Sequence, residues 1–418
     1  MTVESSSESA LPYSCPHVMG EPRPFVELRS VPGPTRQPTS TGDEAWLVAT
    51  YDGVKEMCGD PRIGRSHPDA RQAPRLWDAA MMEATGGHED EATNHHRWRH
   101  TLSRYFSSRR TARLKPSTEA RFDDLVRSCL AAGPPMDVCA DLAYPLAAGV
   151  ICDVLGIPED LRRAMTEWSD AAREHGKAQE AARLRRRLRD GVDSALRRIR
   201  AQPPDRTSDD SLLAGLALAR TGSEDLRDDE LADAVLDVFL AGFDTVAARM
   251  VYGTFFLLAR PVQWKALCED ASLVPGAVEE ILRLAVPGGG WIPRYAQADI
   301  AVREASIKAG DLIVLSFQSA NRDESVFDDA SAFDIRRDPN PHIAFGHGKY
   351  YCLGAALARL ELSVFLTGLT RFSRLRVAAG PGEEPEVAHQ KVTGGLNRLL
   401  VTWETTAEEP QRRSAPPP

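Results

Sequence analysis

The sequence has 418 residues, of which 42% are hydrophobic and 27% are charged, and its formal net charge is −9. This composition is typical of a soluble globular protein, and the negative charge excludes a dedicated nucleic-acid binder, which would carry a basic domain or stripe. The N-terminus lacks the basic start and apolar run of a secretory signal. Seven cysteines, an odd number without paired spacing, indicate reduced thiols. These features predict a cytoplasmic protein that makes no membrane contact.

Helical patterns are the most frequent signal along the chain. Strand signals are fewer: the apolar runs 44–51 and 311–318 predict strands, and the alternating segment 300–311 predicts a hairpin. We therefore predict a mainly α fold with a minor β region, in a single domain over 12–403 between disordered ends at 1–11 and 404–418. The segments that predict helices are 116–131, 140–155, 159–200 (as more than one helix), 228–260, 275–285 and 353–372.

The segment 228–260 predicts one long, buried helix. It begins with acidic residues and stops at Pro261, as helix start and stop signals require. At about 1.5 Å per residue it would span roughly 50 Å, and apolar residues surround most of its circumference. The charges of Asp233, Asp244 and Arg249 exclude a lipid-spanning helix. We expect this helix to cross the centre of the protein.

The middle of this segment reads AGFDTV and contains Gly242, Asp244 and Thr245. A glycine costs about 1 kcal/mol relative to alanine in a helix interior. A threonine hydroxyl can bond back to a carbonyl one turn earlier and bend the axis. A notch with a polar lining would explain the three residues together. A tolerated glycine beside a surface-facing aspartate is the alternative, and the motif alone leaves both open.

A cysteine precedes the last helical segment, in the stretch PHIAFGHGKYYCLGAALARLE at 341–361. A phosphate loop would need G-x-x-x-x-G-K-[ST], a zinc site would need a second nearby cysteine, and nothing local orients His347 as the base for a nucleophile. A lone thiolate ligand of haem iron fits better, because the following helix N-terminus would lower the thiol pKa. The glycines would let the backbone approach a flat macrocycle: Gly346, Gly348 and Gly354.

FGHGKYYCLGAALARLE resembles the haem-binding signature of the cytochrome P450 family, F-G-x-G-x-[HR]-x-C-x-G, beginning at Phe345. The resemblance extends over about 12–403. It implies the P450 fold, with the long central helix over a buried haem b, and Cys352 as the axial ligand of the metal. Tyr350 departs from the pattern, because the family usually has a histidine or arginine there that pairs with a haem propionate. A phenol can donate a hydrogen bond but brings no charge.

Other segments are similar to further motifs of the family. EEILR supplies E-x-x-R as Glu280 and Arg283, which with Arg337 resemble a buried Glu–Arg–Arg network. Such a set is stable only when its hydrogen bonds are closed. The resemblance also implies four bases that bind the haem propionates: His95, Arg99, Arg294 and His342. A separate possibility is a metal pair of His96 and His100 at i,i+4 spacing, for which no third ligand is evident.

The resemblance also implies an activity. Thiolate ligation favours O–O cleavage, and AGFDTV is similar to the family's acid–alcohol pair. In that pair Gly242 would open an oxygen notch, Thr245 would hydrogen-bond dioxygen, and Asp244 would relay protons. The implied enzyme is a monooxygenase that hydroxylates or epoxidises a small molecule with O2. Glycines in AVPGGGWIP would leave room for a bulky secondary metabolite, macrocycle or peptide; the expected lining residues are Ala241, Gly288, Gly289, Gly290, Trp291 and Ile292.

Electrons are expected from outside the chain, because the sequence has no flavin fingerprint and no cysteine cluster for an iron–sulfur centre. A ferredoxin and a ferredoxin reductase are implied, and we expect a monomer. A basic patch on the cysteine side could steer an acidic partner, although a solvated basic face is an equal alternative: Arg109, Arg110, Arg113, Arg336 and Lys349.

Two other functions remain possible from the sequence. The first is a haem-thiolate catalyst that couples aromatic rings or crosslinks a peptide without inserting oxygen. The second is a non-catalytic haem sensor, or a scaffold that activates a partner enzyme. Scaffolds of this kind would be expected to lose the cysteine or the acid–alcohol pair, and both are present.

Overall fold

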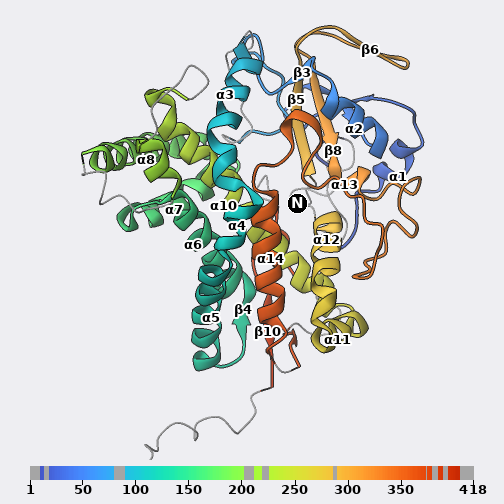
Figure 1. Ribbon diagram of the computed structural model, residues 1–418. Helices are drawn as coiled ribbons and strands as arrows, with labels where there is room; N and C mark the ends of the chain where they lie inside the picture. Colours follow the sequence, from blue (N-terminus) through green and yellow to red (C-terminus); the bar gives the residue numbers. More distant parts are fainter. Residues whose placement is uncertain are drawn as a thin grey trace, which may run out of the picture.

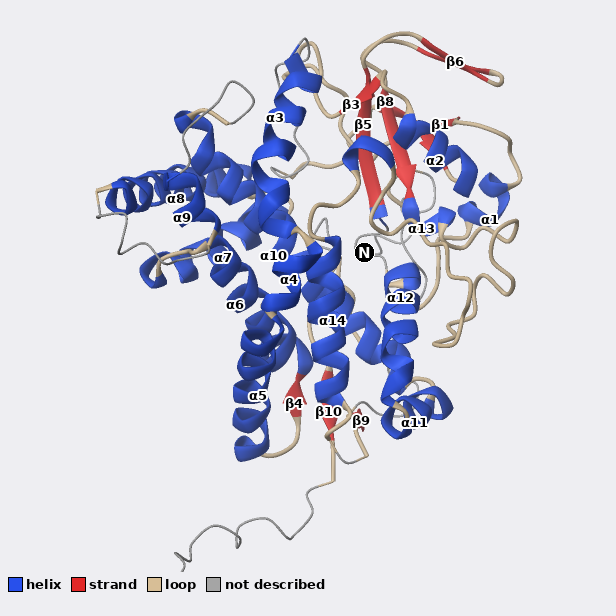
Figure 2. Cartoon of the chain, in the orientation of Figure 1, coloured by secondary structure: helices blue, strands red, loops and turns tan. Residues whose placement is uncertain are grey.

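The structure is a computed structural model that describes residues 10–13, 18–79, 90–201, 211–218, 226–285, 290–372, 374–378, 385–388 and 394–404. Helices fill most of it, and a small sheet lies to one side (Figures 1 and 2). The helices are α1 (Pro24–Arg29), α2 (Tyr51–Gly59), α3 (Glu91–Ser103), α4 (Ser108–Arg113), α5 (Lys115–Ala132), α6 (Tyr144–Leu155), α7 (Glu159–Arg173), α8 (Ala178–Arg200), α9 (Leu212–Leu218), α10 (Asp228–Leu258), α11 (Pro261–Glu269), α12 (Val274–Leu284), α13 (Phe317–Ala320) and α14 (Ala355–Leu369).

The mainly α fold predicted from the sequence is confirmed. The expected helices at 116–131, 275–285 and 353–372 are α5, α12 and α14. The expected helix at 140–155 is α6, preceded by a π-helical turn at Val138–Ala143. The segment 159–200, which was expected to form more than one helix, contains α7 and α8, which separate at a turn where Gly176 has a φ of 77°. Glycine takes this left-handed conformation at no steric cost.

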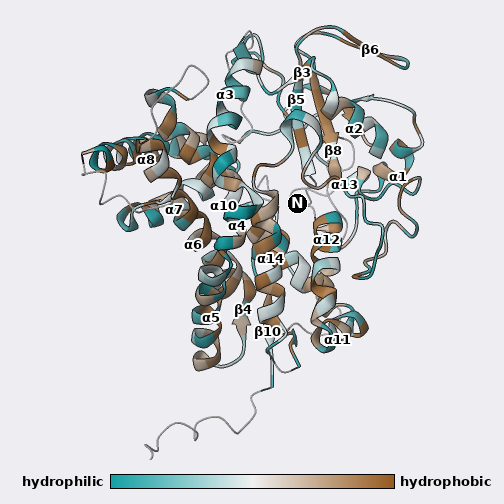
Figure 3. Cartoon of the chain, viewed as in Figure 1, coloured by the Kyte–Doolittle hydropathy of each residue, from teal (hydrophilic) through white to brown (hydrophobic). Residues whose placement is uncertain are grey.

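Helix α10 is the centre of the fold. It contacts α6, α8, α12 and α14, and it begins and ends within two residues of the predicted bounds. The consecutive residues Met250, Val251 and Tyr252 are all buried, and consecutive residues of a helix point to different sides of its axis. Such an all-round apolar surface is stable only in a protein core. Figure 3 shows the same apolar character continuing onto α6 and α14.

The main sheet has the order β1–β2–β8–β5–β3. Its strands are β1 (Thr35–Pro38), β2 (Glu44–Val48), β3 (Ile63–Gly64), β5 (Trp291–Ala296) and β8 (Leu312–Ser316). β2 pairs with β8 in parallel, and the other neighbours are antiparallel. The predicted hairpin is β6 (Ile300–Val302) with β7 (Ala305–Ile307), and a third sheet joins β4 (Met136–Asp137), β10 (Leu400–Thr402) and β9 (Arg376–Val377).

One stretch, Val138–Leu155, is long and apolar enough to cross a membrane when judged by length and composition alone. Within the fold, 61% of it is buried, and α6 packs against α5 and α10. The stretch therefore has the surroundings of a core helix.

The expected N-terminal tail lies largely outside the described residues, and so does most of the expected C-terminal tail. Leu11, which we included in the N-terminal tail, is fully buried, and its N–H donates to the carbonyl of Pro38 at 2.7 Å.

Candidate active site

The cysteine loop lies between the main sheet and α14. Gly346 and Gly348 have φ values of 77° and 67°, and a Cβ at Gly348 would lie 2.7 Å from the carbonyl oxygen of Cys58. The N–H of Cys352 donates to the carbonyl of Phe345 at 2.8 Å and closes the loop. α14 begins three residues later, with Gly354 at its N-cap. The glycines are thus needed for the turn, and the turn places the thiol at a helix N-terminus.

The charge state of Cys352 differs from our expectation. Burial raises the pKa of this thiol; the N–H of Gly354 and the charges of Arg249, Arg99 and Arg359 act in the opposite direction without overcoming it. The helix N-terminus therefore does not by itself produce a thiolate. A coordinated metal ion is the agent that deprotonates such a thiol outright.

The structure brings Glu280, Arg283 and Arg337 together. Both side chains of the Glu280–Arg283 pair are fully buried; Arg283 Nη2 lies 2.7 Å and Nε 2.8 Å from the Glu280 oxygens. Arg337 Nε lies 3.4 Å from Glu280. The remaining donors of Arg283 reach the carbonyls of Asn321, Ala330 and Ala332. The set is closed by hydrogen bonds, as a buried charge cluster requires.

Three of the four expected propionate-binding bases lie around Tyr350 and the cysteine loop. The rings of His95 and Tyr350 are 4.5 Å apart, and Arg294 Cζ lies 5.0 Å from the Tyr350 ring. Arg99 Nη1 donates to the carbonyl of Tyr351. Burial lowers the pKa of His95 to about 4, assisted by Arg65, Arg99 and Lys349. His95 is therefore neutral at pH 7, and the arginines carry the charge.

The fourth base, His342, has a protein partner in this structure, and its contact with a haem carboxylate stays a prediction. Its Nε2 lies 2.9 Å from Glu279 Oε2 on α12, and Glu279 also accepts two hydrogen bonds from Arg359, at 2.7 and 2.8 Å. Burial alone would raise the pKa of Glu279, but these donors lower it to about 2. His342 thus belongs to an ion-pair set that joins α12 to α14.

Sequence reasoning also missed Arg65, which follows β3. Its Cζ lies 4.7 Å from the Tyr350 ring, beside Arg294. Desolvation by the surrounding protein lowers the pKa of Arg65, and desolvation together with the charge of Arg65 lowers that of Arg294 to about 10. Among the described residues, no aspartate or glutamate forms an ion pair with Arg65, Arg99 or Arg294. Arg65 is exposed and Arg99 and Arg294 are half-buried, and this surplus of positive charge fits a haem, whose two carboxylates would supply the missing anions.

On α10 the structure places Asp244 in the interior. The carboxylate has no accessible surface and forms an ion pair with Arg173 of α7, which is also fully buried. The hydroxyl of Tyr144 donates to Asp244 Oδ1 at 3.0 Å, while Oδ2 has no partner. The surface-facing alternative for Asp244 is therefore wrong. Burying a carboxylate oxygen without a hydrogen-bond donor lowers the stability of the folded protein. Asp244 Oδ2 is therefore an atom that can accept a further hydrogen bond.

Thr245 bonds back along the helix, as its sequence context predicted. Its hydroxyl donates to the carbonyl of Ala241 at 2.8 Å. Ala241 and Thr245 retain accessible surface, although their neighbours Phe243, Asp244 and Val246 are buried. These two expected site residues thus share one accessible side of the central helix.

Gly242 has a packing contact. A Cβ at this position would lie 3.0 Å from Ile151 Cδ1 of α6. Close contact between α10 and α6 is sufficient to explain the glycine, and an oxygen notch at Gly242 stays a prediction.

Arg249 is a second residue that sequence reasoning left without a role. It lies one turn after Thr245, and its Nη1 donates to the Thr245 carbonyl at 3.2 Å. Its Nε is buried without a partner, and burial lowers the pKa of the guanidinium to about 10. The position one turn beyond the acid–alcohol pair is the sequence signal that could have identified it.

The expected substrate-lining residues are only partly placed. Gly288 and Gly289 lie outside the described residues, and Gly290 has a φ of 59°. Trp291 was assigned wrongly, because it is buried in a separate aromatic cluster, with ring centroids 5.0 Å from Phe25 and 5.9 Å from Tyr13. Ile292 is half-buried and points to the other face of β5, as strand alternation requires.

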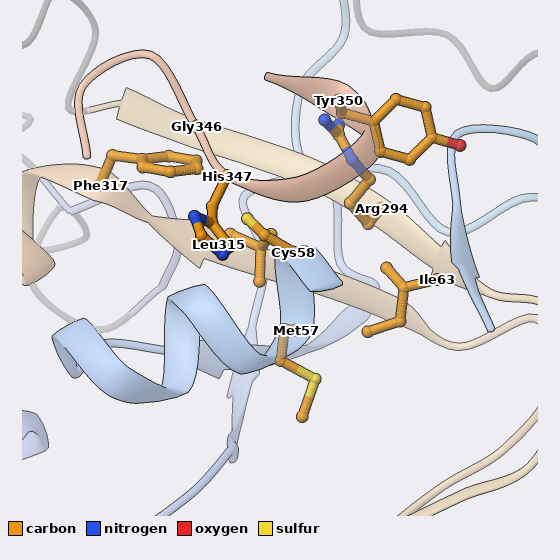
Figure 4. A pocket seen from close by; sticks show the side chains of 9 residues that line it. All are labelled: Met57, Cys58, Ile63, Arg294, Leu315, Phe317, Gly346, His347 and Tyr350. Carbon is orange, nitrogen blue, oxygen red and sulfur yellow. The ribbon is translucent and has the colours of Figure 1, made fainter. Parts of the chain in front are cut away.

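A small pocket lies behind the cysteine loop, between α2, the sheet and the loop (Figure 4). Cys58 and His347 face each other across it, and Arg294 lies beside Tyr350 at one end. Burial raises the pKa of Cys58, so its thiol is protonated at pH 7. The pocket backs the loop that holds Cys352.

The possible metal pair finds no support in the described part of the chain. The rings of His96 and His100 stack 6.3 Å apart, but no group of three or more potential metal ligands occurs among those residues.

Comparison with known proteins agrees with this geometry. The family model of cytochrome P450 matches residues 174–397. Pentalenolactone synthase from Streptomyces exfoliatus is 34% identical over 94% of this chain and 98% of its own. Mycinamicin IV hydroxylase/epoxidase from Micromonospora griseorubida is 32% identical over 96% of this chain and 100% of its own. The crystal structure of the mycinamicin VIII C21 methyl hydroxylase from Micromonospora griseorubida superposes with a TM-score of 0.82, at 29% identity, covering 94% of this chain and 100% of that one.

The chain therefore belongs to the cytochrome P450 family. It is a haem-dependent monooxygenase of the bacterial type, and its relatives include hydroxylases and epoxidases of secondary metabolites.

Proposed function

We propose that the protein hydroxylates or epoxidises a bulky secondary metabolite, using haem b, O2 and electrons from a ferredoxin and its reductase. One observation carries the proposal: the Cys352 loop, the arginines around Tyr350 and the Asp244–Thr245 pair coexist in one fold. A non-catalytic sensor or scaffold would not need the third of these.

Cys352 would hold the iron, and Arg99 and Arg294 would bind the haem carboxylates. The sequence has no C-x-x-C-H, which supports a haem held without covalent attachment. When bound, a thiolate-ligated haem supplies the oxygen activation that insertion into an unactivated substrate requires. We further propose that the protein works as a cytoplasmic monomer.

The residues of α10 would handle protons. Thr245 would turn its hydroxyl away from the Ala241 carbonyl and hold a proton at the accessible side of α10. Asp244 can deliver protons from solvent only if its carboxylate leaves Arg173 and Tyr144, because it is fully enclosed there. The unpartnered Oδ2 is the atom best placed to begin this exchange.

A difference spectrum of the reduced, CO-treated holoprotein tests the ligand assignment. We expect the red-shifted Soret band of a thiolate complex in the wild type and in Cys58→Ala, whose thiol lies close to the same loop. Cys352→Ala should lose this band. A histidine-type spectrum in the wild type would reject the proposal.

Mass spectrometry of the product tests the reaction. A gain of one oxygen atom, labelled from 18O2, is expected. A loss of two hydrogens without oxygen would instead identify oxidative coupling or crosslinking.

A further inference from the structure

A cluster of charged and aromatic side chains surrounds Tyr350, and we call it the Tyr350 cluster: Arg65, Glu91, His95, Arg294 and Tyr350. Arg65 Cζ and Arg294 Cζ lie 4.7 and 5.0 Å from the Tyr350 ring. A guanidinium over a phenol ring is attracted to the negative face of the ring. Figure 4 shows Arg294 beside Tyr350, with the phenol oxygen pointing away from the pocket. The ring thus holds cations, while its hydroxyl is used elsewhere.

The hydroxyl of Tyr350 donates to Glu91 Oε1. Glu91 also accepts from the backbone N–H of Arg65 and of Ser66, each at 2.8 Å, and from the hydroxyl of Ser66. Burial alone would raise the pKa of Glu91, but these donors lower it to about 2, so the group is ionised at pH 7. A side chain on Gly64 would clash with this carboxylate. Glu91 therefore fixes both the backbone of Arg65 and the orientation of the Tyr350 ring.

The single acid of the cluster is occupied by these donors, and none of them is a guanidinium. Arg294 donates to the carbonyl of Pro293 and Arg99 to that of Tyr351, and no described carboxylate pairs with Arg65. Arg65 is exposed and the other two arginines are half-buried, and neighbouring charges of one sign repel one another. The cost of gathering them is offset when a dianion binds. The two carboxylates of haem are such a dianion. Arg99 and Arg294, the expected propionate-binding residues, lie close enough to Arg65 for their charges to repel it.

We propose that Arg65 binds a haem carboxylate in this protein, and that Tyr350 and Glu91 are positioning residues that hold its guanidinium. Tyr350 occupies the position where the family signature has a basic side chain, and its own phenol brings no charge. Arg65 supplies that charge from the segment that follows β3, far from Tyr350 in the sequence. The proposal rests on the haem site assigned above.

Haem release tests the proposal without reference to activity. Holoprotein is mixed with excess apomyoglobin, and the rate of haem transfer is followed by absorbance. We expect Arg65→Leu to release haem about tenfold faster or more, the factor that one charge-assisted hydrogen bond contributes. Arg62→Leu is the matched control, because Arg62 is an exposed arginine three residues away that pairs with Asp60. It should release haem at the wild-type rate.

A second substitution tests whether Arg65 acts through its charge or only by packing against the Tyr350 ring. In the Arg65→Leu background, Tyr350→Arg should slow haem release towards the wild-type rate, because it returns a positive charge to the same place. If Arg65 merely braced the loop against the Tyr350 ring, Tyr350→Arg would remove the ring and accelerate release further. Either this acceleration or wild-type release by Arg65→Leu would overturn the proposal.

If Arg65→Leu does not fold, Arg65→Gln replaces it, since glutamine keeps most of the stem and removes the charge. Faster haem release is again expected, and an unchanged rate would again overturn the inference. The midpoint potential gives an independent readout, because removing a nearby positive charge should shift it to more negative values. A wild-type protein that binds no haem would refute the proposed function itself, whereas unchanged release by the variants would refute only the role of Arg65.

Discussion

Arg173 and Asp244 form an ion pair in which neither side chain has accessible surface. The pair joins α7 to the middle of α10, and the hydroxyl of Tyr144 of α6 donates a hydrogen bond to the same carboxylate. Burial and Asp244 both raise the pKa of the Tyr144 phenol, so it remains a donor throughout the physiological range. The acid proposed to handle protons is thus a structural element of the resting protein as well.

This pair predicts a large loss of stability when one member is removed. Arg173→Met leaves the Asp244 charge enclosed without its partner, which should lower the free energy of unfolding by about 3–5 kcal/mol. Arg173→Met combined with Asp244→Asn should recover most of the loss, because the charge is removed with its partner. Denaturant titration measures both. Arg189 forms a more exposed ion pair, in which its Nη1 lies 3.0 Å from Asp233 Oδ2. Arg189→Met should therefore lower the free energy of unfolding by less than about 1 kcal/mol. Equal losses of stability in Arg173→Met and Arg189→Met would contradict the argument.

Thr245→Ala is expected to uncouple electron consumption from product formation. Without the hydroxyl, reduced oxygen should leave as hydrogen peroxide, so the ratio of product to reductant consumed should fall several-fold. Thr254→Ala is a close control, because Thr254 lies on the same helix and makes the same 2.8 Å bond to a carbonyl one turn earlier. Measuring peroxide, product and reductant together decides the point. Unchanged coupling in Thr245→Ala would remove this residue from the proposed mechanism.

Glu279 predicts a specific pH dependence of stability. Its pKa in the folded protein is about 2, below the ordinary value of 4.5, owing to Arg359 and His342. Its contribution is therefore complete above about pH 4.5 and is lost as the pH falls towards 2. Glu279→Gln should be less stable than the wild type at pH 7, and the difference should shrink below about pH 4.5. Denaturant titrations at several pH values test this.

Glu167→Gln provides the comparison for Glu279. Glu167 lies in an exposed i,i+4 pair, 3.5 Å from Arg163, and should show a small difference at every pH. A Glu279→Gln difference that stays constant down to pH 3 would show that the ion-pair set does not act through its charge.

We predict that the electron donor binds on the side of the molecule that carries Cys352. α4 packs against α14, the helix that follows Cys352, and Arg109 and Arg113 of α4 are exposed. Substituting both with glutamate should slow reduction by a ferredoxin about tenfold at low ionic strength, with a smaller effect at high salt. Stopped-flow reduction measures the rate. The control substitutes Arg183 and Arg186 on α8 in the same way, and an equal effect there would point to net charge alone.

The sequence predicted the parts of this protein that depend on local pattern. The long apolar run predicted α10, and the glycines around Cys352 predicted the turn before α14. Arg65, Glu91 and Tyr350 could not be grouped in advance, because residues 26 and 259 positions apart along the chain meet only in the folded state. Local rules would have improved one assignment: alternation along β5 puts Ile292 and Arg294 on one face and Trp291 on the other.

Arg173 illustrates a signal that sequence reasoning left unused. It lies on the face of α7 that also carries Met165, Trp168 and Ser169, all of which are buried. A charged residue on the apolar stripe of a helix is expected to have an enclosed partner. The partner itself, Asp244, could be found only from the packing of α7 against α10.

The groups gathered around Tyr350 set an order for the biogenesis of the enzyme. Glu91 and His95 emerge from the ribosome early, whereas Tyr350 and Cys352 are among the last parts of the folded region to be synthesised. A nascent chain that stops short of position 350 has Arg65, Glu91, His95 and Arg294 but neither Tyr350 nor Cys352, so stable cofactor capture must wait until translation is nearly finished. Truncation shortly before position 350 would therefore leave a polypeptide that has most of its helices and lacks the thiol proposed to hold the iron.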